Sequence, residues 1–458
     1  MGKDSKLMEI ISQISGYVWG PPLLILLVGT GIYLTIRLGF LQFRMLPYAL
    51  KLAFSPAKQD KKAEGDISHY QALSTAMAAT IGTGNIVGVA TAVVVGGPGA
   101  VFWMWITALV GMATKYAEAI LAVKYRVKNS KGEMSGGPMY YLEKGLNAKW
   151  LGVLFAIFGS IAAFGIGNMV QANSVSDVAN SSFNIPTWVT GVALSVIAAL
   201  VILGGIKSIG KVTAFFVPIM AAFYVIGGLI IIILNFDLVP TAFSTIFSDA
   251  FTGSAVGGGL LGTAIRYGVA RGVFSNEAGL GSAPIAAAAA RTDYPGRQAL
   301  VSMTQVFIDT IIVCTITGLT IVMGNLYAGG LNGGELTSAS FEMFLGGTGQ
   351  YVVTIGIILF AFSTLVGWSY YGEKCFSYLF KDNAIIYYRL AFILFIFVGS
   401  IASLDVVFGF ADIMNGLMAF PNLIGLLGLS GVVVAETKRF MKVAQEEKRQ
   451  EKLQKAAS

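Results

Sequence analysis

Two apolar stretches of this chain, each long enough to cross a bilayer, are interrupted by glycine and small polar residues. The first interruption covers residues 79–86 (ATIGTGNI) and the second covers residues 274–282 (FSNEAGLGS). In lipid, backbone amides and carbonyls must be satisfied internally, so a helix breaks at membrane depth only where the break lines a cavity. Two such breaks at matching places in the two halves of a chain indicate a transporter binding site.

The helix ends at the first break have complementary chemistry. Free N–H groups near Gly84 and Asn85, at the positive end of the resuming helix, suit a carboxylate, and Thr83 adds a hydroxyl donor. The carbonyls near Ala78 and Ile81, where the preceding helix stops, suit an ammonium group or a sodium ion. A glycine packing or kink site is the alternative interpretation.

Side-chain amides near the breaks are further candidates for substrate contacts. Ser275 and Asn276 lie within the second break, and Asn168 and Gln171 are three residues apart on one predicted helix face. Buried amides also hold helices together in membranes, which is the alternative for each of them.

Two carboxylates lie at membrane depth, where ionisable residues are costly and indicate function. For Glu277 we expect pairing with Arg266 or Arg271, or capping of the resuming helix, in preference to proton carriage. For Asp309 the sequence identifies no partner.

Bulky side chains are expected to limit the size of the substrate. Phe164, Phe274, Trp368 and Met414 are predicted near the cavity, where they leave room only for a hydrogen or methyl side chain. Each of them, taken alone, is more often a packing residue.

The composition establishes the class of protein. Hydrophobic residues make up 55% of the 458 residues and charged residues 12%, and the mean hydropathy is +0.73. These values exclude a soluble protein. We expect an all-α polytopic membrane protein with about 11 transmembrane helices. The expected spans are 20–36, 71–95, 101–123, 151–176, 187–205, 211–234, 256–290, 300–324, 351–379, 385–402 and 407–434.

Charge predicts how the chain crosses the membrane. The first interhelical loop alone contains Arg37, Arg44, Lys51, Lys58, Lys61 and Lys62. Later loops on the same side are also basic, so this side is predicted to be cytoplasmic, with the N-terminus outside and the C-terminus inside a cell membrane. The net charge of +7 is therefore explained by the basic residues of the predicted cytoplasmic loops and does not indicate nucleic-acid binding. No metal-ligand cluster, phosphate loop or nucleophile motif indicates an enzyme.

Without the first span, the ten others divide into two groups of five that begin with oppositely oriented broken helices. This pattern predicts a 5+5 inverted repeat. The expected organisation is an N-terminal transmembrane helix and basic cytoplasmic loop (1–66), a first repeat (67–234), a second repeat (235–434) and a charged cytoplasmic tail (435–458).

A long motif at residues 96–111 (GGPGAVFWMWITALVG) resembles the signature of the alanine or glycine:cation symporter family, the prokaryotic sodium:alanine symporters. The resemblance extends to 82–85 (GTGN), 168–174 (NMVQANS) and 276–281 (NEAGLG), and covers essentially the whole chain. It implies a leucine-transporter-like fold and sodium-coupled uptake of small amino acids, with proton coupling in some relatives.

The resemblance also implies an ion site. In transporters of this fold, two adjacent hydroxyl residues join carbonyls of the first broken helix around sodium. By position these are Ser363 and Thr364, with the carbonyls of Ala78, Ile81 and Phe360. The alternative is that both hydroxyls bond back to their own helix.

Together these features predict a secondary active transporter that moves alanine or glycine into the cell with sodium by alternating access. Sodium is the expected coupling ion, no organic cofactor is expected, membrane lipid is the other partner, and a monomer is sufficient. A proton-coupled symporter and a solute channel are the alternatives. An intramembrane enzyme using Ser275 or Glu277 lacks a base partner. The expected substrate-binding residues are Thr83, Gly84, Asn85, Phe164, Asn168, Gln171, Phe274, Ser275, Asn276 and Trp368.

Overall fold

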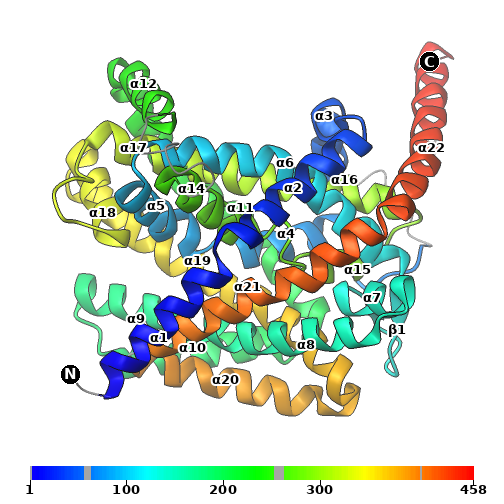
Figure 1. Cartoon of the computed structure of the whole chain (residues 1–458), viewed down its shortest axis with the longest axis horizontal. Helices are drawn as coiled ribbons and strands as arrows, with labels where there is room; N and C mark the ends of the chain where they lie inside the picture. Colours follow the sequence, from blue (N-terminus) through cyan, green and yellow to red (C-terminus); the bar gives the residue numbers. More distant parts are fainter. Residues whose placement is uncertain (1–2, 56–62, 252–261, 403–404, 458) are drawn as a thin grey trace.

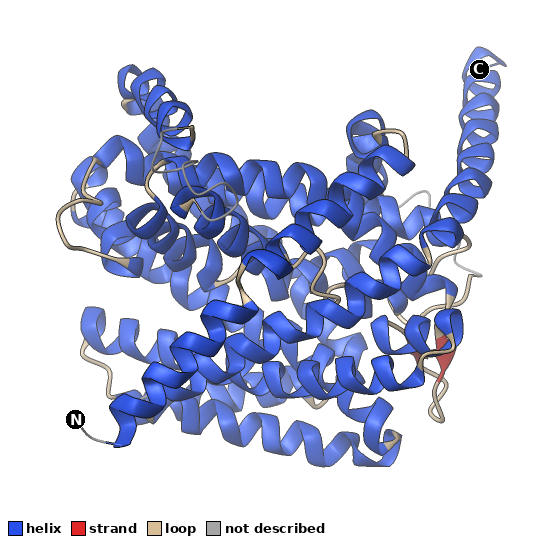
Figure 2. Ribbon diagram, viewed as in Figure 1, coloured by secondary structure: helices blue, strands red, loops and turns tan. Residues whose placement is uncertain are grey.

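The computed structural model describes residues 3–55, 63–251, 262–402 and 405–457. These residues form a bundle of long helices, with the two ends of the chain at opposite ends of the molecule (Figure 1). Within the described residues, strands are limited to a small antiparallel pair, β1 (Val127–Lys128) and β2 (Met134–Ser135) (Figure 2).

The expected spans correspond to helices or to pairs of helical segments. These are α2 (Pro21–Arg37), α4 (His69–Thr80) with α5 (Val89–Gly96), α6 (Gly99–Lys124), α8 (Lys149–Phe164) with α9 (Val170–Phe183), α10 (Thr187–Ile202), α11 (Gly205–Leu234), α14 (Thr263–Asn276) with α15 (Pro284–Ala288), α16 (Pro295–Val306) with α17 (Thr315–Gly324), α19 (Gly347–Phe380), α20 (Ile385–Ile401) and α21 (Asp405–Gly428). Residues 256–261 of the predicted seventh span, and Lys58, Lys61 and Lys62, lie outside the described residues.

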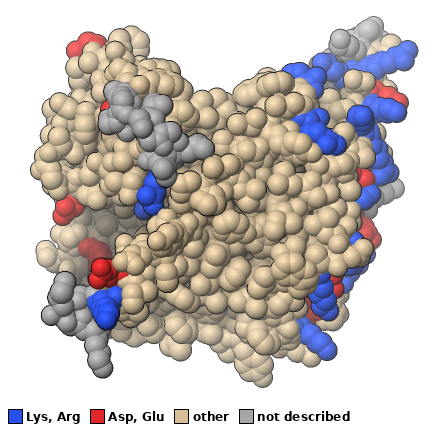
Figure 3. All heavy atoms as spheres, viewed as in Figure 1, with Lys and Arg blue, Asp and Glu red and all other residues tan. Residues whose placement is uncertain are grey.

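By length and composition, the described residues contain eight helices able to cross a membrane, or nine if the bent pair α4 and α5 is one span. The expected number of 11 is therefore not confirmed. The difference arises because α10 has only 16 residues and because the second broken helix is divided into short pieces. Most Lys and Arg side chains on the visible face gather toward the end where α7 (Pro138–Leu146) and α22 (Ser430–Ala457) lie (Figures 1 and 3).

Several helices were not expected from the sequence. The region 37–66, predicted as a basic loop, contains α3 (Leu41–Phe54), whose buried positions include Leu41, Ala49 and Leu52 on one helical face. The other additions include α1 (Lys3–Val18), α7 (Pro138–Leu146), α12 (Val239–Ala250) and α18 (Gly333–Leu345).

The N-terminal helices are attached to α21. Gly20 and Pro21 separate α1 from α2, since proline favours the first position of a helix. Ser15 Oγ donates to Asp412 Oδ2 at 2.9 Å, and Trp19 Nε1 donates to the Asp412 carbonyl at 3.2 Å. Helix α1 is thus attached to α21, and α2, the predicted first span, packs on α6 and α21.

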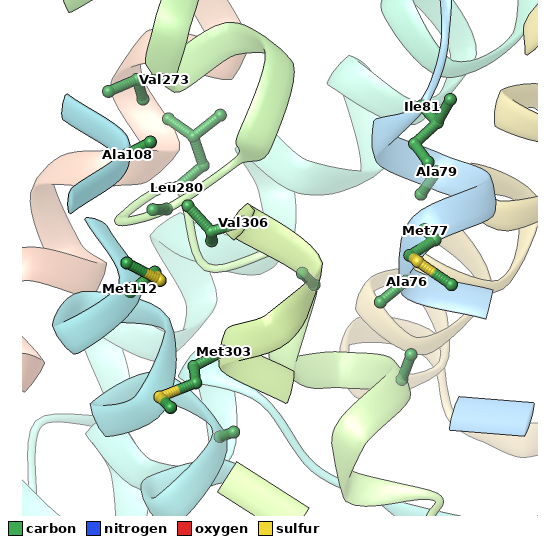
Figure 4. Close-up of a cluster of buried hydrophobic side chains, with 14 of the residues drawn as sticks. Ala76, Met77, Ala79, Ile81, Ala108, Met112, Val273, Leu280, Met303 and Val306 are labelled. Carbon is green, nitrogen blue, oxygen red and sulfur yellow. The ribbon is translucent and has the colours of Figure 1, made fainter. Parts of the chain in front are cut away.

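The core forms around α6 and α19. Helix α6 packs against α14 and α16, and α19 packs against α4, α8 and α9. Figure 4 shows side chains of α4 (Ala76, Met77 and Ala79), α6 (Ala108 and Met112) and α16 (Met303 and Val306) in one apolar cluster, with Leu280 of the second break beside them.

Close contact between α19 and α4 depends on Gly367. A Cβ at this position would lie 2.7 Å from the backbone nitrogen of Ala79 and 2.8 Å from its Cα. Backbone atoms in a packed helix pair cannot move aside without a cost in packing.

We expect Gly367→Ala to lower the free energy of unfolding by about 1–3 kcal/mol, measured as a lower thermal midpoint of the purified protein. Gly29→Ala is the matched control, since no atom lies within 4 Å of its Cβ; equal midpoints for the two variants would contradict the prediction.

Candidate functional site

The first break separates α4 from α5 and is held by side chains. Ile81 is extended, a π-helical turn (Gly84–Gly88) follows, and the two helices are bent by 52°. The Gly82 N–H donates to Asn85 Oδ1 at 2.8 Å, which satisfies an amide that the break would leave free. Gly82 also packs closely on α19, because a Cβ at this position would clash with Thr364 Oγ1.

The second break follows Asn276, the last residue of α14. Glu277 adopts a left-handed conformation with φ of 56°, and Asn276 Oδ1 accepts the N–H of Ala278 at 3.0 Å. The next amides of the break, those of Gly279 and Gly281, both donate to one oxygen of Glu118 at 3.1 Å.

The Glu118 carboxylate belongs to a buried charged group between α6 and the second break. Its Oε1 also accepts from Asn422 Nδ2 at 2.7 Å, and its Oε2 lies 3.8 Å from Lys115 Nζ. Lys115 in turn donates to the Glu277 carbonyl at 3.1 Å. Lys115 and Glu118 are both almost fully buried, so this pair fixes the backbone of the break from within the bundle.

Oxygen atoms converge where α19 passes the first break. Ser363 Oγ lies 3.2 Å from the Ala78 carbonyl, 3.3 Å from that of Ile81 and 2.9 Å from that of Phe360. Thr364 Oγ1 lies 2.9 Å from the same Phe360 carbonyl. A serine hydroxyl has one hydrogen and can satisfy one of these acceptors fully. The remaining oxygen atoms form a set of hard ligands suited to a cation such as sodium.

A small cavity of about 20 Å³ lies between the two breaks, with room for one or two water molecules. It is lined by Ala79, Thr80, Gly82, Thr83, Gly84, Ile166, Gln171, Phe274, Glu277, Leu280, Thr364, Trp368 and Asn415. Five of the predicted substrate-binding residues are among them, namely Thr83, Gly84, Gln171, Phe274 and Trp368.

The other predicted substrate residues lie outside this cavity. Asn85 and Ser275 bond to Asp309, at 2.7 and 2.9 Å, and Asn276 Nδ2 donates to Thr310 Oγ1 at 3.1 Å. Asn168 Nδ2 donates to the Phe392 carbonyl at 2.7 Å. The Phe164 ring packs against the rings of Tyr388, Phe392 and Phe395 near α20.

Glu277 has partners other than those expected. Its Oε1 accepts from Trp368 Nε1 at 2.9 Å and its Oε2 accepts from Ser282 Oγ at 2.6 Å. The expected pairing with Arg266 or Arg271 is wrong, because both arginines lie one or more helical turns before the break, on the part of α14 that lines a separate vestibule. The carboxylate instead lines the cavity.

Asn415 and Ile166 are cavity residues that the sequence analysis did not identify. Asn415 of α21 lines the cavity, and its Oδ1 is buried without a hydrogen-bond partner among the described residues. The sequence did contain a signal for Asn415, because this polar amide lies inside an apolar predicted span, directly after Met414, which was expected near the cavity.

A vestibule of about 370 Å³ lies between α1, α14 and α21. Arg266, Arg271 and Asp412 give it charged walls, and the guanidinium of Arg271 lies 5.7 Å from the Phe274 ring centroid. Phe274 lines both the vestibule and the cavity. Phe274 is therefore a wall residue of both spaces.

At the other ends of the broken helices, backbone segments are hydrogen-bonded together. Residues 64–67 and 289–292 form four backbone hydrogen bonds, including a parallel bridge between Ile67 and Ala290. The Arg126 guanidinium donates to three carbonyls of the same region at 2.7–3.0 Å. These hydrogen bonds join the segment that precedes α4 to the segment that follows α15.

The sequence profile of the sodium:alanine symporter family matches residues 4–455. The chain belongs to this family. Its members are transporters and not enzymes, and the family assignment by resemblance is confirmed. The helical fold has a solved counterpart in the structure of MhsT in complex with L-phenylalanine, with a TM-score of 0.54 and 14% identity, covering 82% of this chain and 99% of that one. This likeness shows a leucine-transporter-like fold.

Relatives within the sodium:alanine symporter family align along almost the whole chain. The sodium/alanine symporter AgcS of Methanococcus maripaludis is 60% identical over 448 residues, covering 96% of this chain and 98% of the relative. The probable sodium/glutamine symporter GlnT of Bacillus subtilis is 39% identical, covering 95% and 91%. The putative sodium/proton-dependent alanine carrier protein YrbD of Bacillus subtilis is 37% identical, covering 92% and 90%.

The buried pair of Lys115 and Glu118 provides a test of how the second break is held. Glu118→Gln keeps an oxygen for the break amides but leaves the Lys115 ammonium without its nearest counter-charge. We expect it to lower the free energy of unfolding by about 3–5 kcal/mol, measured by unfolding of the purified protein. Adding Lys115→Met should restore part of the loss. Glu446→Gln, on an exposed position of α22, is the control; a Glu118→Gln variant as stable as this control would refute the role of the pair.

Proposed function

We propose that this chain is a sodium-coupled symporter of alanine or glycine that works by alternating access. The observation that supports this most is the adjacency of two sites. Thr364 lines the cavity, and its neighbour Ser363 lies within 3.3 Å of the Ala78 and Ile81 carbonyls. A sodium ion held by these oxygens would touch the wall of the cavity. Ion and substrate would then stabilise the same arrangement of α4 and α19.

The cavity has groups for each part of a small amino acid. The backbone of Thr83 and Gly84, at the start of the resuming helix, suits the carboxylate. The Glu277 carboxylate, which lines the cavity, suits the ammonium group, with Gln171 and Asn415 as additional polar contacts. In the structure the cavity of about 20 Å³ has room only for water, so it must widen to admit an amino acid. The rings of Phe274 and Trp368 in its wall would then limit the side chain to a hydrogen or a methyl group.

The names of the relatives support the ion and the substrate class. AgcS is named as a sodium/alanine symporter, and GlnT as a probable sodium/glutamine symporter. Because these names differ in substrate, we base the choice of alanine or glycine on the higher identity to AgcS, 60% against 39% for GlnT, and on the rings of Phe274 and Trp368 in the cavity wall.

The breaks also support an arrangement of the chain in the membrane. We infer that residues 67–234 and 235–434 are inverted repeats, with the N-terminus outside and the C-terminus inside the cell membrane. In this orientation the vestibule faces outward, and the hydrogen-bonded segments 64–67 and 289–292 close the cytoplasmic side. Opening inward would require these main-chain bonds to separate.

Proton coupling is the second candidate. It is favoured by the name of YrbD, a putative sodium/proton-dependent carrier, and by the buried carboxylate of Glu277 in the cavity wall. A channel is less well supported, because the cavity is small and main-chain contacts close one end.

Transport in liposomes tests the proposed function directly. With sodium high outside, purified protein should accumulate labelled alanine above the equilibrium concentration, because the sodium gradient supplies the free energy. Equilibration without accumulation would indicate a channel or uniporter. Accumulation driven by a proton gradient in the absence of sodium would show that the coupling ion is the proton and not sodium.

Thr364→Ala tests the ion site. Loss of one oxygen ligand should raise the sodium concentration for half-maximal alanine uptake about tenfold, equivalent to ~1.4 kcal/mol. The control is Ser369→Ala on the same helix, whose Oγ donates to the Val366 carbonyl at 2.7 Å and which is not among the residues that line the cavity. An unchanged sodium dependence in Thr364→Ala would exclude Thr364 from the ion site.

A further inference from the structure

Helix α3 has two opposite faces that are both apolar. One face contains the buried Leu41 and Leu52 and packs against α16, α4 and α6. Phe43 and Phe54 lie on the other face, because each follows one of these leucines by two positions in the helix. Together with the neighbouring ring of Phe40, these rings are between 47% and 53% exposed. A stripe of three exposed aromatic rings indicates a surface that contacts an apolar partner.

Two cations lie beside these rings on the exposed face of α3. Arg44 and Lys51 are both exposed and are about two turns apart, so they form a row along the helix. Among the residues that the structure describes, neither side chain forms an ion pair. The face therefore presents positive charge that the described part of the protein does not neutralise.

The exposed face of α3 continues the surface that the protein presents to lipid. Helix α3 lies at the edge of the bundle beside α2 and α16 (Figure 1). Before α3, the exposed Ile36 belongs to the spanning helix α2. At the other end, the Phe54 ring lies 6.0 Å from the Tyr70 ring, and Tyr70 Oη donates to the Ala214 carbonyl of the spanning helix α11. The next residue of α11, Phe215, is also exposed.

Aromatic rings and cations on one helix face are the chemistry of a helix that lies in the membrane interface. The rings contact acyl chains near the headgroups, and Arg or Lys side chains extend to the phosphates. Anionic headgroups are favoured over zwitterionic ones, because their net negative charge attracts each cation. An exposed stripe of rings in water would be unfavourable, which argues against a face that contacts only solvent.

We propose that α3 forms a binding site for anionic phospholipid, with headgroup phosphates on Arg44 and Lys51 and acyl chains on Phe43 and Phe54. The two cations are about 10 Å apart along the helix, so each can hold its own phosphate. Because the opposite face of α3 packs on α16 and α4, bound lipid would stabilise this group of helices. The inference requires that the chain spans a membrane, and it is independent of the coupling ion and the substrate.

Native mass spectrometry of the detergent-purified, full-length protein with added lipid tests the site. The wild type should bind anionic phosphatidylglycerol more tightly than zwitterionic phosphatidylcholine. Replacing both cations, in Arg44→Gln with Lys51→Gln, should lower the affinity for phosphatidylglycerol about thirtyfold, since each cation contributes a factor of about five. The affinity for phosphatidylcholine should not change. Equal affinities of the wild type for the two lipids would overturn the proposal.

A control with the same loss of charge separates a local site from general attraction. Lys438→Gln with Lys442→Gln removes two cations from exposed positions of α22. This variant should keep the wild-type affinity for phosphatidylglycerol. Equal losses of affinity in the α3 and α22 variants would show that the lipid responds to net charge, and the site on α3 would be overturned.

The apolar part of the site is tested by Phe43→Ala. Loss of the ring should lower the affinity for phosphatidylglycerol about fivefold, because less apolar surface remains for the acyl chains. Phe247→Ala on α12 is the control, since this ring is 46% exposed and that of Phe43 is 47% exposed. If the two variants bound the lipid equally well, α3 would not be its binding site.

Thermal unfolding distinguishes a lipid from a free anion. Phosphatidylglycerol should raise the thermal midpoint of the wild type more than that of the variant without Arg44 and Lys51, because a ligand of the folded state stabilises it. Inorganic phosphate at the same concentration lacks acyl chains and should have a smaller effect. An equal rise with inorganic phosphate would indicate a free-anion site and contradict the lipid proposal.

Discussion

The structure depends on how main-chain groups are satisfied where two helices break inside an apolar bundle. Without water, each free amide needs a partner from the protein itself. Asn85 accepts the Gly82 amide, Asn276 accepts the Ala278 amide, and Glu118 accepts two more from the second break. These side chains come from the broken helices and from α6. Thr83 and Gly84, at the start of the resuming helix, line the cavity.

The second requirement is close packing of the unbroken helix α19 against α4. Gly367 brings the two backbones into contact, and Gly82 makes room for the Thr364 hydroxyl. As a result, Ser363 lies among three carbonyls from two helices. Small residues at a helix contact are typical of membrane bundles, where association depends on packing and hydrogen bonds. Here they also determine the distances within the oxygen cluster.

The helical class and the two breaks were predictable from the sequence because hydropathy and glycine placement are local signals. The convergence of Ala78, Ile81, Phe360, Ser363 and Thr364 was predicted through family resemblance and not from spacing, since these residues are nearly 290 positions apart. Helix α3 was missed because its basic residues concealed an apolar face. The count of spans was uncertain where helices are short or broken.

The partners of buried charges were the least predictable part of the site. Sequence proximity suggested arginines for Glu277, whereas the structure shows Trp368 and Ser282. Asp309 had no identifiable partner, because Asn85 and Ser275 lie 224 and 34 residues away in the chain. Such contacts depend on tertiary packing, and a single sequence contains no direct record of them. The roles of the predicted substrate and ion residues remain predictions.

The position of Phe274 has a consequence for rates. Phe274 is partly exposed and lines both the vestibule and the cavity, and a side chain with space to move changes rotamer in picoseconds to nanoseconds. At the opposite end, several main-chain hydrogen bonds and the Arg126 guanidinium must separate together, as in collective motions of microseconds to milliseconds. On the proposed transport pathway, movement of the Phe274 ring would therefore meet a lower barrier than separation of the bonded segments. A solute in the cavity would exchange with the vestibule many times before the other end opens once.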